Sequence, residues 1–411
     1  MALNKLQKLL RKNGIILLDG STGAALQKRG MPKGVCPEKW AFENPEPLIT
    51  LQKEYVAAGS KILYTFTLGG TSPKLSEFGP VGSVEALNEG LARVTRKAAG
   101  KKALVAGDIG PTGRFPKPFG DMDFEDCVNI FKEQVRGLIK GGVDLFVIET
   151  MIDIQEARAA LLACKELSKL PVIVSMTFDK DKRTLTGTTP EAAVITLQSL
   201  GADVVGVNCS TGPKEMVEVV AAMKPYAKVP LMAKPNAGLP RLVDGVTVFD
   251  MKPAEFASYT TPLIKAGACM VGGCCGTTPE FIRLMKRNSK VRAQKSKLKN
   301  TPVSVLSSAR RAVQIGPGNT VIVGERINPT GKKQLQEELK AGQNSEIRRF
   351  AAEQAENGAQ VLDVNVGMPG IDEKSVMLST VLLLSSITDL PLCLDSSSPE
   401  VLEAALRIYP G

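Results

Sequence analysis

Short apolar runs alternate with helix-length segments over roughly the first 290 residues, and each run ends at small, polar or glycine-rich residues. The eight runs span residues 15–20, 61–66, 103–108, 144–150, 171–178, 203–209, 229–236 and 269–275. Their apolar character is continuous rather than alternating, which is typical of parallel strands covered by helices on both faces. Helices are expected between them, for example over Asp123–Gly142, Asp153–Lys169 and Pro190–Leu200.

The number of runs favours one fold class. Eight strands with eight crossovers in under 300 residues predict an α/β chain that begins with a (β/α)8, or TIM, barrel. An open doubly wound sheet fits less well, because no GxGxxG turn follows an early strand. In barrels of this type the reactive side chains lie where the strands end, so the strand ends are the places to search for chemistry.

A second series of strands and helices begins near residue 320. Its expected strands are 320–328, 359–367 and 390–398, and its expected helices are Asn344–Asn357, about Glu373–Ser386 and Pro399–Ile408. Three parallel strands are too few to close a barrel, so the pattern predicts an incomplete, truncated second β/α barrel. The predicted organisation is a first barrel over 1–292, a basic linker over 293–319 and the start of the second barrel over 320–411.

Charge and composition exclude several kinds of function for this chain. The chain of 411 residues contains no histidine, which excludes histidine-based catalytic triads, histidine general bases and histidine metal ligands. The net charge of +10 comes from ten Lys or Arg residues between Phe281 and Asn319, a stretch without any acid. Because the remainder is balanced, we interpret this stretch as a solvated linker and expect no nucleic-acid partner.

The first twenty residues contain no secretory signal pattern, and no window is apolar enough to span a membrane. The sequence therefore predicts a cytoplasmic protein with no membrane partner. In that setting the eight cysteines are expected to be reduced thiols or metal ligands rather than a disulfide framework. Five of them stand singly in apolar or helical contexts and are expected to pack inertly: Cys36, Cys127, Cys164, Cys269 and Cys393.

The other three cysteines lie at strand ends. Cys209 ends the sixth strand, and the vicinal pair Cys274–Cys275 ends the eighth, flanked by glycines that permit the backbone to leave the pleat. Three thiolates with an open fourth position are typical of a catalytic zinc site, and a substrate thiol in that position becomes a sulfur nucleophile. Three buried core cysteines or a strained vicinal disulfide are the alternatives.

Polar residues at other strand ends could complete a binding site. The Asp19-Gly20-Ser21-Thr22 loop opens into a helix, where backbone N–H groups suit a carboxylate and Asp19 could hold an ammonium. Glu149 ends the fourth strand, and Asn208 and Asn236 end the sixth and seventh. A small molecule with an amine, a carboxylate and a thiol would suit this set, although Glu149 could equally be a helix-capping or rim charge.

These residues stand within five segments that resemble the homocysteine S-methyltransferase family: DGSTGAALQ, FVIETM, GVNCS, KPNAGLP and VGGCCGTTPEFI. The resemblance covers nearly all of residues 10–290. It implies a (β/α)8 barrel in which zinc, held by Cys209, Cys274 and Cys275, activates homocysteine.

The second series resembles the pterin-binding methyltransferase domain through VGERINPTG, LDVNVG and LCLDSSS. This resemblance implies that a pterin is gripped at three successive strand ends by Glu325, Asn328, Asp363, Asn365 and Asp395. The order of the two domains is similar to the N-terminal half of cobalamin-dependent methionine synthases. It implies 5-methyltetrahydrofolate as methyl donor, methionine as product, and cobalamin supplied by a downstream module or another chain.

Two other functions stay open. One is a homocysteine or other thiol methyltransferase that uses a different donor, such as S-methylmethionine, a betaine or a separate corrinoid protein. The other is a binding or scaffold module in which zinc is purely structural and has a closed fourth ligand.

Overall fold

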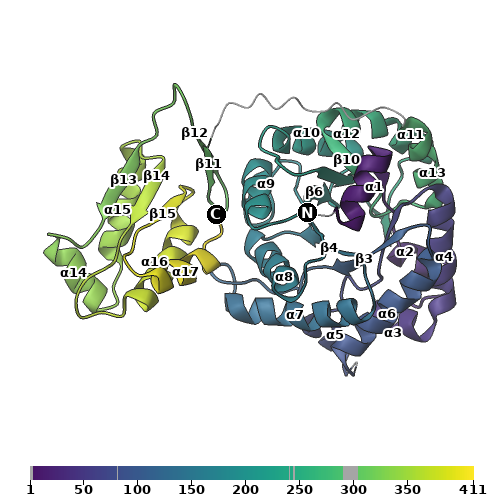
Figure 1. Cartoon of the computed structure of the whole chain (residues 1–411), viewed down its shortest axis with the longest axis horizontal. Coiled ribbons are helices and arrows are strands. Elements are labelled where there is room, and N and C mark those ends of the chain that lie inside the picture. Colours follow the sequence, from purple (N-terminus) through teal and green to yellow (C-terminus); the bar gives the residue numbers. More distant parts are fainter. Residues whose placement is uncertain (1–2, 81, 240, 244–245, 290–303) are drawn as a thin grey trace.

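The computed structural model describes residues 3–80, 82–239, 241–243, 246–289 and 304–411. All eight expected runs form strands of one parallel sheet, which confirms the predicted barrel fold (Figure 1). The strands are β1 (Ile16–Leu17), β2 (Ile62–Tyr64), β3 (Leu104–Ile109), β4 (Leu145–Met151), β5 (Val172–Met176), β6 (Val204–Asn208), β7 (Leu231–Lys234) and β10 (Ala268–Val271). Their order is β1-β10-β7-β6-β5-β4-β3-β2.

The barrel closes between β1 and β2, the two ends of that order. The Lys61 N–H donates to the Leu17 carbonyl at 2.8 Å, and the Ser60 hydroxyl donates to the Leu18 carbonyl at 2.9 Å. The Asp19 carboxylate accepts the Tyr64 N–H at 2.7 Å, so a side chain completes the ladder where backbone pairing stops. These bonds fix Asp19 at the inner wall of the barrel.

Helices cover the outside of the barrel, and most of them begin at a proline or at a capping polar residue. They are α2 (Gly23–Gln27), α3 (Pro37–Glu43), α4 (Pro45–Ala58), α5 (Ser72–Ser76), α6 (Val84–Ala99), α7 (Phe124–Lys140), α8 (Ile154–Leu167), α9 (Pro190–Ser199), α10 (Pro213–Met223), α11 (Pro253–Ser258), α12 (Thr260–Ala266) and α13 (Pro279–Asn288). A small antiparallel hairpin, β8 (Arg241–Val243) with β9 (Val246–Val248), follows β7. The strands are buried on both faces, as their continuous apolar sequence predicts.

Helix α1 (Lys5–Asn13) closes one end of the barrel. Its Leu6 is buried among inward-facing strand residues such as Ile16 and Met270. Its Lys5 forms an ion pair of 2.6 Å with Asp144, which precedes β4. The N-terminal ends of the strands are therefore plugged, and the loops at their C-terminal ends form the accessible mouth.

The segment expected to be a linker over 293–319 lies partly outside the described residues. Its described part is an antiparallel hairpin, β11 (Ser304–Ser307) and β12 (Ala312–Ile315), and so differs from the expected linker. The hairpin forms because Val313 and Ala309 bury apolar surface, while Ser307 bonds to Thr196 of α9 at 3.0 Å. The short apolar pattern of this hairpin was not recognised in the sequence because it stands among many basic residues.

The second series forms a three-stranded parallel sheet ordered β13-β14-β15. The strands are β13 (Val323–Ile327), β14 (Val361–Val364) and β15 (Leu392–Leu394), and the helices are α14 (Lys333–Lys340), α15 (Ser345–Glu356), α16 (Glu373–Ile387) and α17 (Pro399–Ile408). The expected strands and helices are present, and α14 was not expected. No helix in the described part of the chain combines the length and apolarity needed to cross a lipid bilayer.

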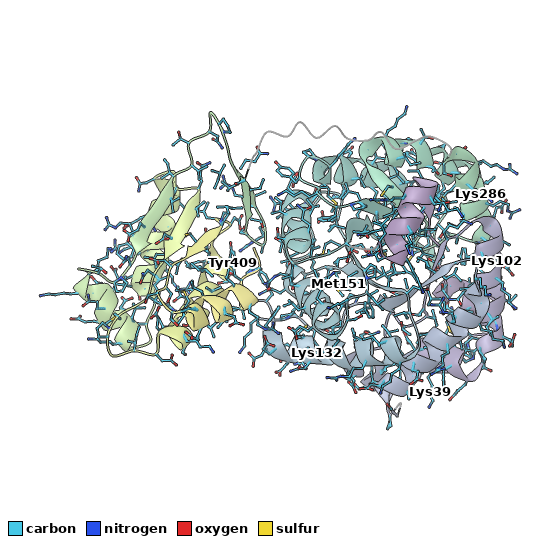
Figure 2. All side chains as sticks on the ribbon, viewed as in Figure 1. Lys39, Lys102, Lys132, Met151, Lys286 and Tyr409 are labelled. Carbon is cyan, nitrogen blue, oxygen red and sulfur yellow. The ribbon has the colours of Figure 1, made fainter. Side chains whose placement is uncertain are left out.

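The second unit contacts the barrel through α17 and the β11–β12 hairpin (Figure 1). Arg407 pairs with Glu125 of α7 and, at 2.8 Å, with Glu166 of α8. Tyr409, labelled in Figure 2, accepts the Leu392 N–H at 2.8 Å and donates to the Ser307 carbonyl at 3.0 Å. One tyrosine thus ties the hairpin to the parallel sheet.

Candidate metal and thiol-binding site

Three cysteine sulfurs converge at the mouth of the barrel. The Sγ atoms of Cys209, Cys274 and Cys275 all lie within 4.8 Å of one another, and the Cys209 and Cys275 sulfurs are 3.9 Å apart. All three are free thiols and partly accessible, which agrees with neither a vicinal disulfide nor three buried core cysteines. Tertiary folding brings the ends of β6 and β10 together, although β7 lies between them.

Unusual backbone conformations direct these sulfurs inward. Cys209 and Ser210 both have left-handed φ angles, 62° and 57°, so the chain turns sharply where β6 ends. At the end of β10, Gly273 passes so close to Thr277 that an added Cβ would lie 2.4 Å from its Oγ1. Gly276 has φ +78°, which favours glycine. The vicinal pair thereby leaves the pleat, as the flanking glycines suggested.

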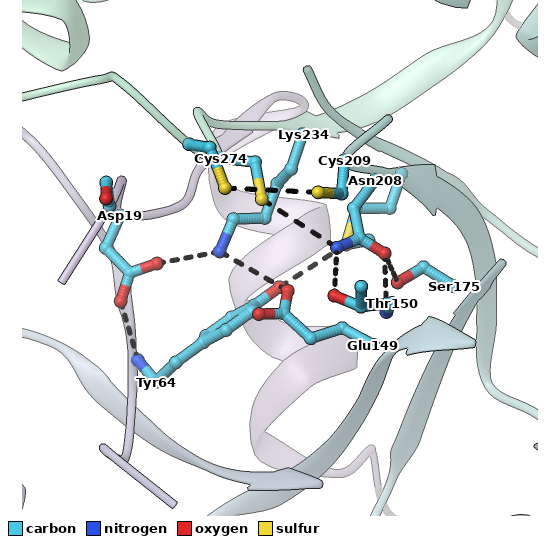
Figure 3. A network of polar contacts seen from close by, with 12 residues as sticks. Asp19, Tyr64, Glu149, Thr150, Ser175, Asn208, Cys209, Lys234 and Cys274 are labelled. Atoms are coloured by element: carbon cyan, nitrogen blue, oxygen red, sulfur yellow. Dashed lines mark hydrogen bonds and ion pairs between the residues drawn. The ribbon is translucent and has the colours of Figure 1, made fainter. Parts of the chain in front are cut away.

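Two asparagines hold the cysteine loops in place. Asn208 accepts the Thr150 N–H and donates to the Thr150 hydroxyl, both at 2.8 Å, and its amide donates to Cys274 Sγ at 3.9 Å (Figure 3). Asn236 accepts the Cys275 N–H at 3.0 Å. Both residues were predicted as substrate contacts, and the structure adds that their bonds support the cysteine loops.

The three thiols differ in pKa. Hydrogen bonds from Cys274 and Cys275 lower the pKa of Cys209 to about 3, while the contact with Cys209, together with burial, raises the pKa of Cys275 to about 12. One sulfur is therefore favoured as a thiolate even before a metal binds. Deprotonated sulfur is the form that ligates zinc.

A buried ionic cluster lies just below the sulfurs. The Lys234 ammonium is 3.0 Å from Asp19 Oδ1, 3.7 Å from Glu149 Oε2, and 3.5 Å from the centre of the Tyr64 ring (Figure 3). Burial alone would lower the pKa of Lys234, but the Asp19 and Glu149 carboxylates outweigh it and hold that pKa well above its usual value. Lys234 is therefore a charged ammonium inside the barrel.

A third buried carboxyl, Asp108, lies near Asp19 and Glu149. Burial raises the pKa of Asp108 well above its usual value, and Glu149 adds to the rise by repulsion. Burial likewise raises the pKa of Glu149. Sequence reasoning missed Lys234, Tyr64 and Asp108. The signal for Lys234 and Asp108 was a charged residue near the end of an apolar run, whereas nothing in the run distinguished Tyr64.

The Asp19–Thr22 loop lies on the same side of the barrel, after β1. The Ser21 N–H donates to Thr277 Oγ1 at 3.2 Å, and the Tyr55 hydroxyl donates to the Ser21 carbonyl at 2.8 Å. Gly20 is required for this packing, since an added Cβ would lie 2.7 Å from Thr277 Oγ1. The loop is thus attached to the segment that carries Cys274 and Cys275.

The second sheet carries its own polar cluster at the strand ends. Asn365 donates to Asp395 Oδ2 at 2.9 Å, and Asn328 donates to Glu325 Oε1 at 2.7 Å. Burial raises the pKa of Asp363, and the charges of Asp395 and Glu325 add to the rise, so these carboxyls lie near one another. The predicted residues therefore gather at one edge of this sheet.

Cys393 is exposed beside this cluster and was expected to pack inertly in an apolar context. It faces Asp363 across β14 and β15, and the alternation of side chains along a strand places it on the polar face. By contrast, burial raises the pKa of Cys127 and Cys164 far above the usual thiol value, which agrees with packing roles.

Comparison with known proteins decides the family. Residues 16–289, which are more than half of the chain, match the sequence profile described as Homocysteine S-methyltransferase. The chain belongs to this family. It is therefore a methyltransferase, and the general reaction of the family is methylation of homocysteine. Residues 324–411 match the profile described as Pterin binding enzyme.

Solved structures with the same fold include the homocysteine methyltransferase MmuM from Escherichia coli. Its metallated form has a TM-score of 0.61 at 24% identity, and covers 70% of this chain and 100% of that one. The oxidized form has a TM-score of 0.60 at 25% identity, and the apo form 0.55 at 26%, each with the same coverage.

The observed sulfurs suit the metal of this zinc-dependent family. A zinc ion that binds three sulfurs at about 2.3 Å in tetrahedral geometry holds them about 3.8 Å apart. The separation of 3.9 Å between Cys209 and Cys275 agrees with that value. Zinc also binds soft thiolate ligands in preference to oxygen ligands. The three cysteines therefore fit a zinc ion.

Proposed function

We propose that this chain transfers a methyl group to the sulfur of homocysteine, giving methionine, at the mouth of the first barrel. Cys209, Cys274 and Cys275 would hold zinc, and the spacing of their sulfurs is the observation that carries the proposal. Zinc, when bound, accepts a substrate thiol as its remaining ligand and stabilises it as the thiolate nucleophile. The metallated form of MmuM, which shares the fold, supports this reading.

The chain's own residues orient the reactants. Asn208 and Asn236 fix the cysteine loops, so the three sulfurs are held before substrate arrives. The Asp19–Thr22 loop, with its Gly20 and Ser21 backbone, would receive the carboxylate end of the thiol substrate, and the buried Glu149 at the end of β4 would lie beside the substrate. Positioning of this kind supplies a large part of catalysis in bimolecular transfers.

The methyl donor belongs to the second unit in this proposal. Five polar residues would bind the pterin of 5-methyltetrahydrofolate: Glu325, Asn328, Asp363, Asn365 and Asp395. Support comes from the match of residues 324–411 to pterin-binding enzymes. Cobalamin, supplied by a downstream module or another chain, would carry the methyl group between the two sites.

One measurement tests the thiol site directly. X-ray absorption at the zinc edge should show three sulfur ligands without homocysteine and a fourth sulfur when homocysteine is added. A closed four-ligand site that does not respond to homocysteine would support the structural-zinc alternative and refute the proposal.

A second experiment separates the donors. Purified protein is given homocysteine with free methylcobalamin, with S-methylmethionine or with a betaine, and methionine is measured. We expect methionine from methylcobalamin. If methionine forms only from S-methylmethionine or a betaine, that compound is the methyl donor and the corrinoid is not.

A further inference from the structure

Lys234 occupies an unexpected position for a lysine. It is the last residue of β7, only 3% of its side chain is exposed, and its ammonium points into the barrel rather than to solvent (Figure 3). Its two ionic partners, Asp19 and Glu149, lie in the same network as the cysteines and are the carboxylates that sequence reasoning offered for the amine of a thiol amino acid (Figure 3). A charged group is stable at such depth only with partners of this kind.

The hydrogen-bonding capacity of Asp19 is already used by the protein. Its Oδ1 accepts from Lys234 at 3.0 Å, and its Oδ2 accepts the Tyr64 N–H at 2.7 Å. Because that second bond helps to close the barrel between β1 and β2, Asp19 cannot turn toward a substrate without opening the wall. Asp19 therefore serves Lys234 and the barrel.

Glu149 is the remaining carboxylate. No donor among the described residues lies within hydrogen-bond distance of its buried Oε2, and the nearest cation is Lys234 at 3.7 Å. A substrate ammonium placed on this oxygen would lie close to the Lys234 ammonium among buried side chains. Like charges repel strongly in such surroundings.

We infer that Lys234 is a built-in ammonium that takes the place of the substrate's α-ammonium, so that this site selects short mercapto carboxylates by thiol and carboxylate alone. Homocysteine belongs to that class and gains little from its amine, whereas 4-mercaptobutanoate, which lacks only the amine, is an equally good acceptor. The inference rests on the proposed methyl transfer to a thiol at the three-cysteine site.

The test compares two thiols that differ only in the amine. The ratio of kcat/KM for homocysteine to that for 4-mercaptobutanoate is measured in the whole chain with methylcobalamin as donor. A ratio below ten is expected for the unaltered protein. A preference of tenfold or more for homocysteine would overturn the inference.

Lys234→Met provides the second arm, because it leaves Oδ1 of Asp19 and Oε2 of Glu149 without a cation, while Oδ2 of Asp19 keeps its bond to the Tyr64 N–H, so that a substrate ammonium can bind there. The ratio is expected to rise at least tenfold, mainly through a lower KM for homocysteine. A lysine with only a structural role would affect both thiols alike and leave the ratio unchanged, and any smaller rise refutes the inference. Lys165→Met, which breaks the 2.8 Å pair with Asp203 away from the mouth, is the matched control and should leave the ratio unaltered.

Binding without turnover separates this inference from the proposed function. Calorimetry compares L-methionine with 4-(methylthio)butanoate, the product pair, on the unaltered protein, so it depends neither on methyl transfer nor on the folding of a variant. Dissociation constants within tenfold of each other support the inference even if neither thiol is methylated, an outcome that would refute the proposed function alone. Clearly tighter binding of methionine, or binding of neither acid, would overturn the inference.

Discussion

The two strand-end clusters of this chain use similar residues in different surroundings. At the mouth of the first barrel, Asp19 and Glu149 are 2% and 8% exposed and face a buried lysine. At the end of the second sheet, Glu325 and Asp395 are exposed and bond to asparagine amides. The closed sheet excludes water, so each charge there needs a fixed partner, while solvent compensates the charges on the open sheet.

The two clusters therefore differ in how strongly each is organised before a ligand binds. A closed barrel holds its sulfurs and charges in place through packing and hydrogen bonds, and the loss of one charged group leaves its buried partner without compensation. The open cluster tolerates substitution and acts mainly through contacts with its ligand.

Replacement of a zinc-site sulfur should have the largest effect. Cys274→Ser or Cys275→Ser should remove stoichiometric zinc and lower methyl transfer to homocysteine by about a thousandfold or more, because two sulfurs hold zinc too weakly for catalysis. Metal analysis and turnover measure this, while far-UV circular dichroism should stay nearly native.

Cys393→Ser on the exposed strand of the second sheet is the matched control and should keep both zinc and turnover. If both mouth variants retain zinc and full turnover, the three-cysteine site is not the reactive centre.

Loss of the carboxylate that partners Lys234 should destabilise the barrel. Asp19→Asn leaves a buried ammonium with only the more distant Glu149, and the free energy of unfolding should fall by about 3 kcal/mol. Urea denaturation measures the change. Glu54→Gln, which breaks the accessible 2.7 Å pair with Arg29, should cost less than about 1 kcal/mol. If the two substitutions lower the free energy of unfolding equally, the ionic cluster around Lys234 is not desolvated.

Glu156 should make the barrel's stability depend on pH. Burial raises its pKa to about 7, and Thr112 donates to its Oε1 at 2.6 Å. Between about pH 4.5 and 7 the folded protein therefore binds more protons than the unfolded chain, so this group lowers stability as pH rises through that window. Glu156→Gln should be more stable than the unaltered protein at pH 8, by at most about 3 kcal/mol, and similar to it at pH 4. A stability difference that is the same at both pH values would show that Glu156 does not titrate in this window.

The open cluster should show the smallest effect. Asp395→Asn should weaken binding of 5-methyltetrahydrofolate about tenfold, which corresponds to about 1.4 kcal/mol. Unfolding free energy, zinc content and methylation from free methylcobalamin should stay unchanged, because this carboxylate is exposed. Fluorescence titration of the ligand measures the change, with Glu356→Gln on α15 as control. Loss of the first barrel's activity in Asp395→Asn would contradict the separation of the two sites.

Much of the fold was predictable because its signal is local. Continuous apolar runs mark strands buried on both faces, and every expected run became a strand of the predicted sheet. The β11–β12 hairpin and α14 were not predicted, since short amphipathic segments among many charges give weak periodicity. Cys209, Cys274 and Cys275 were identifiable together because their strand ends must share one mouth.

Residue type and spacing alone specify the eight strands of the barrel and the three strands of the second sheet in their order along the chain, and they place the sulfurs, asparagines and carboxylates at strand ends. Only the tertiary structure decided the partner of each charge. Lys234 ends an apolar run and would ordinarily reach solvent, yet the closed barrel joins it to Asp19, 215 residues away. Burial of an ammonium is favourable only where folding brings carboxylates to it, and no local pattern encodes that arrangement.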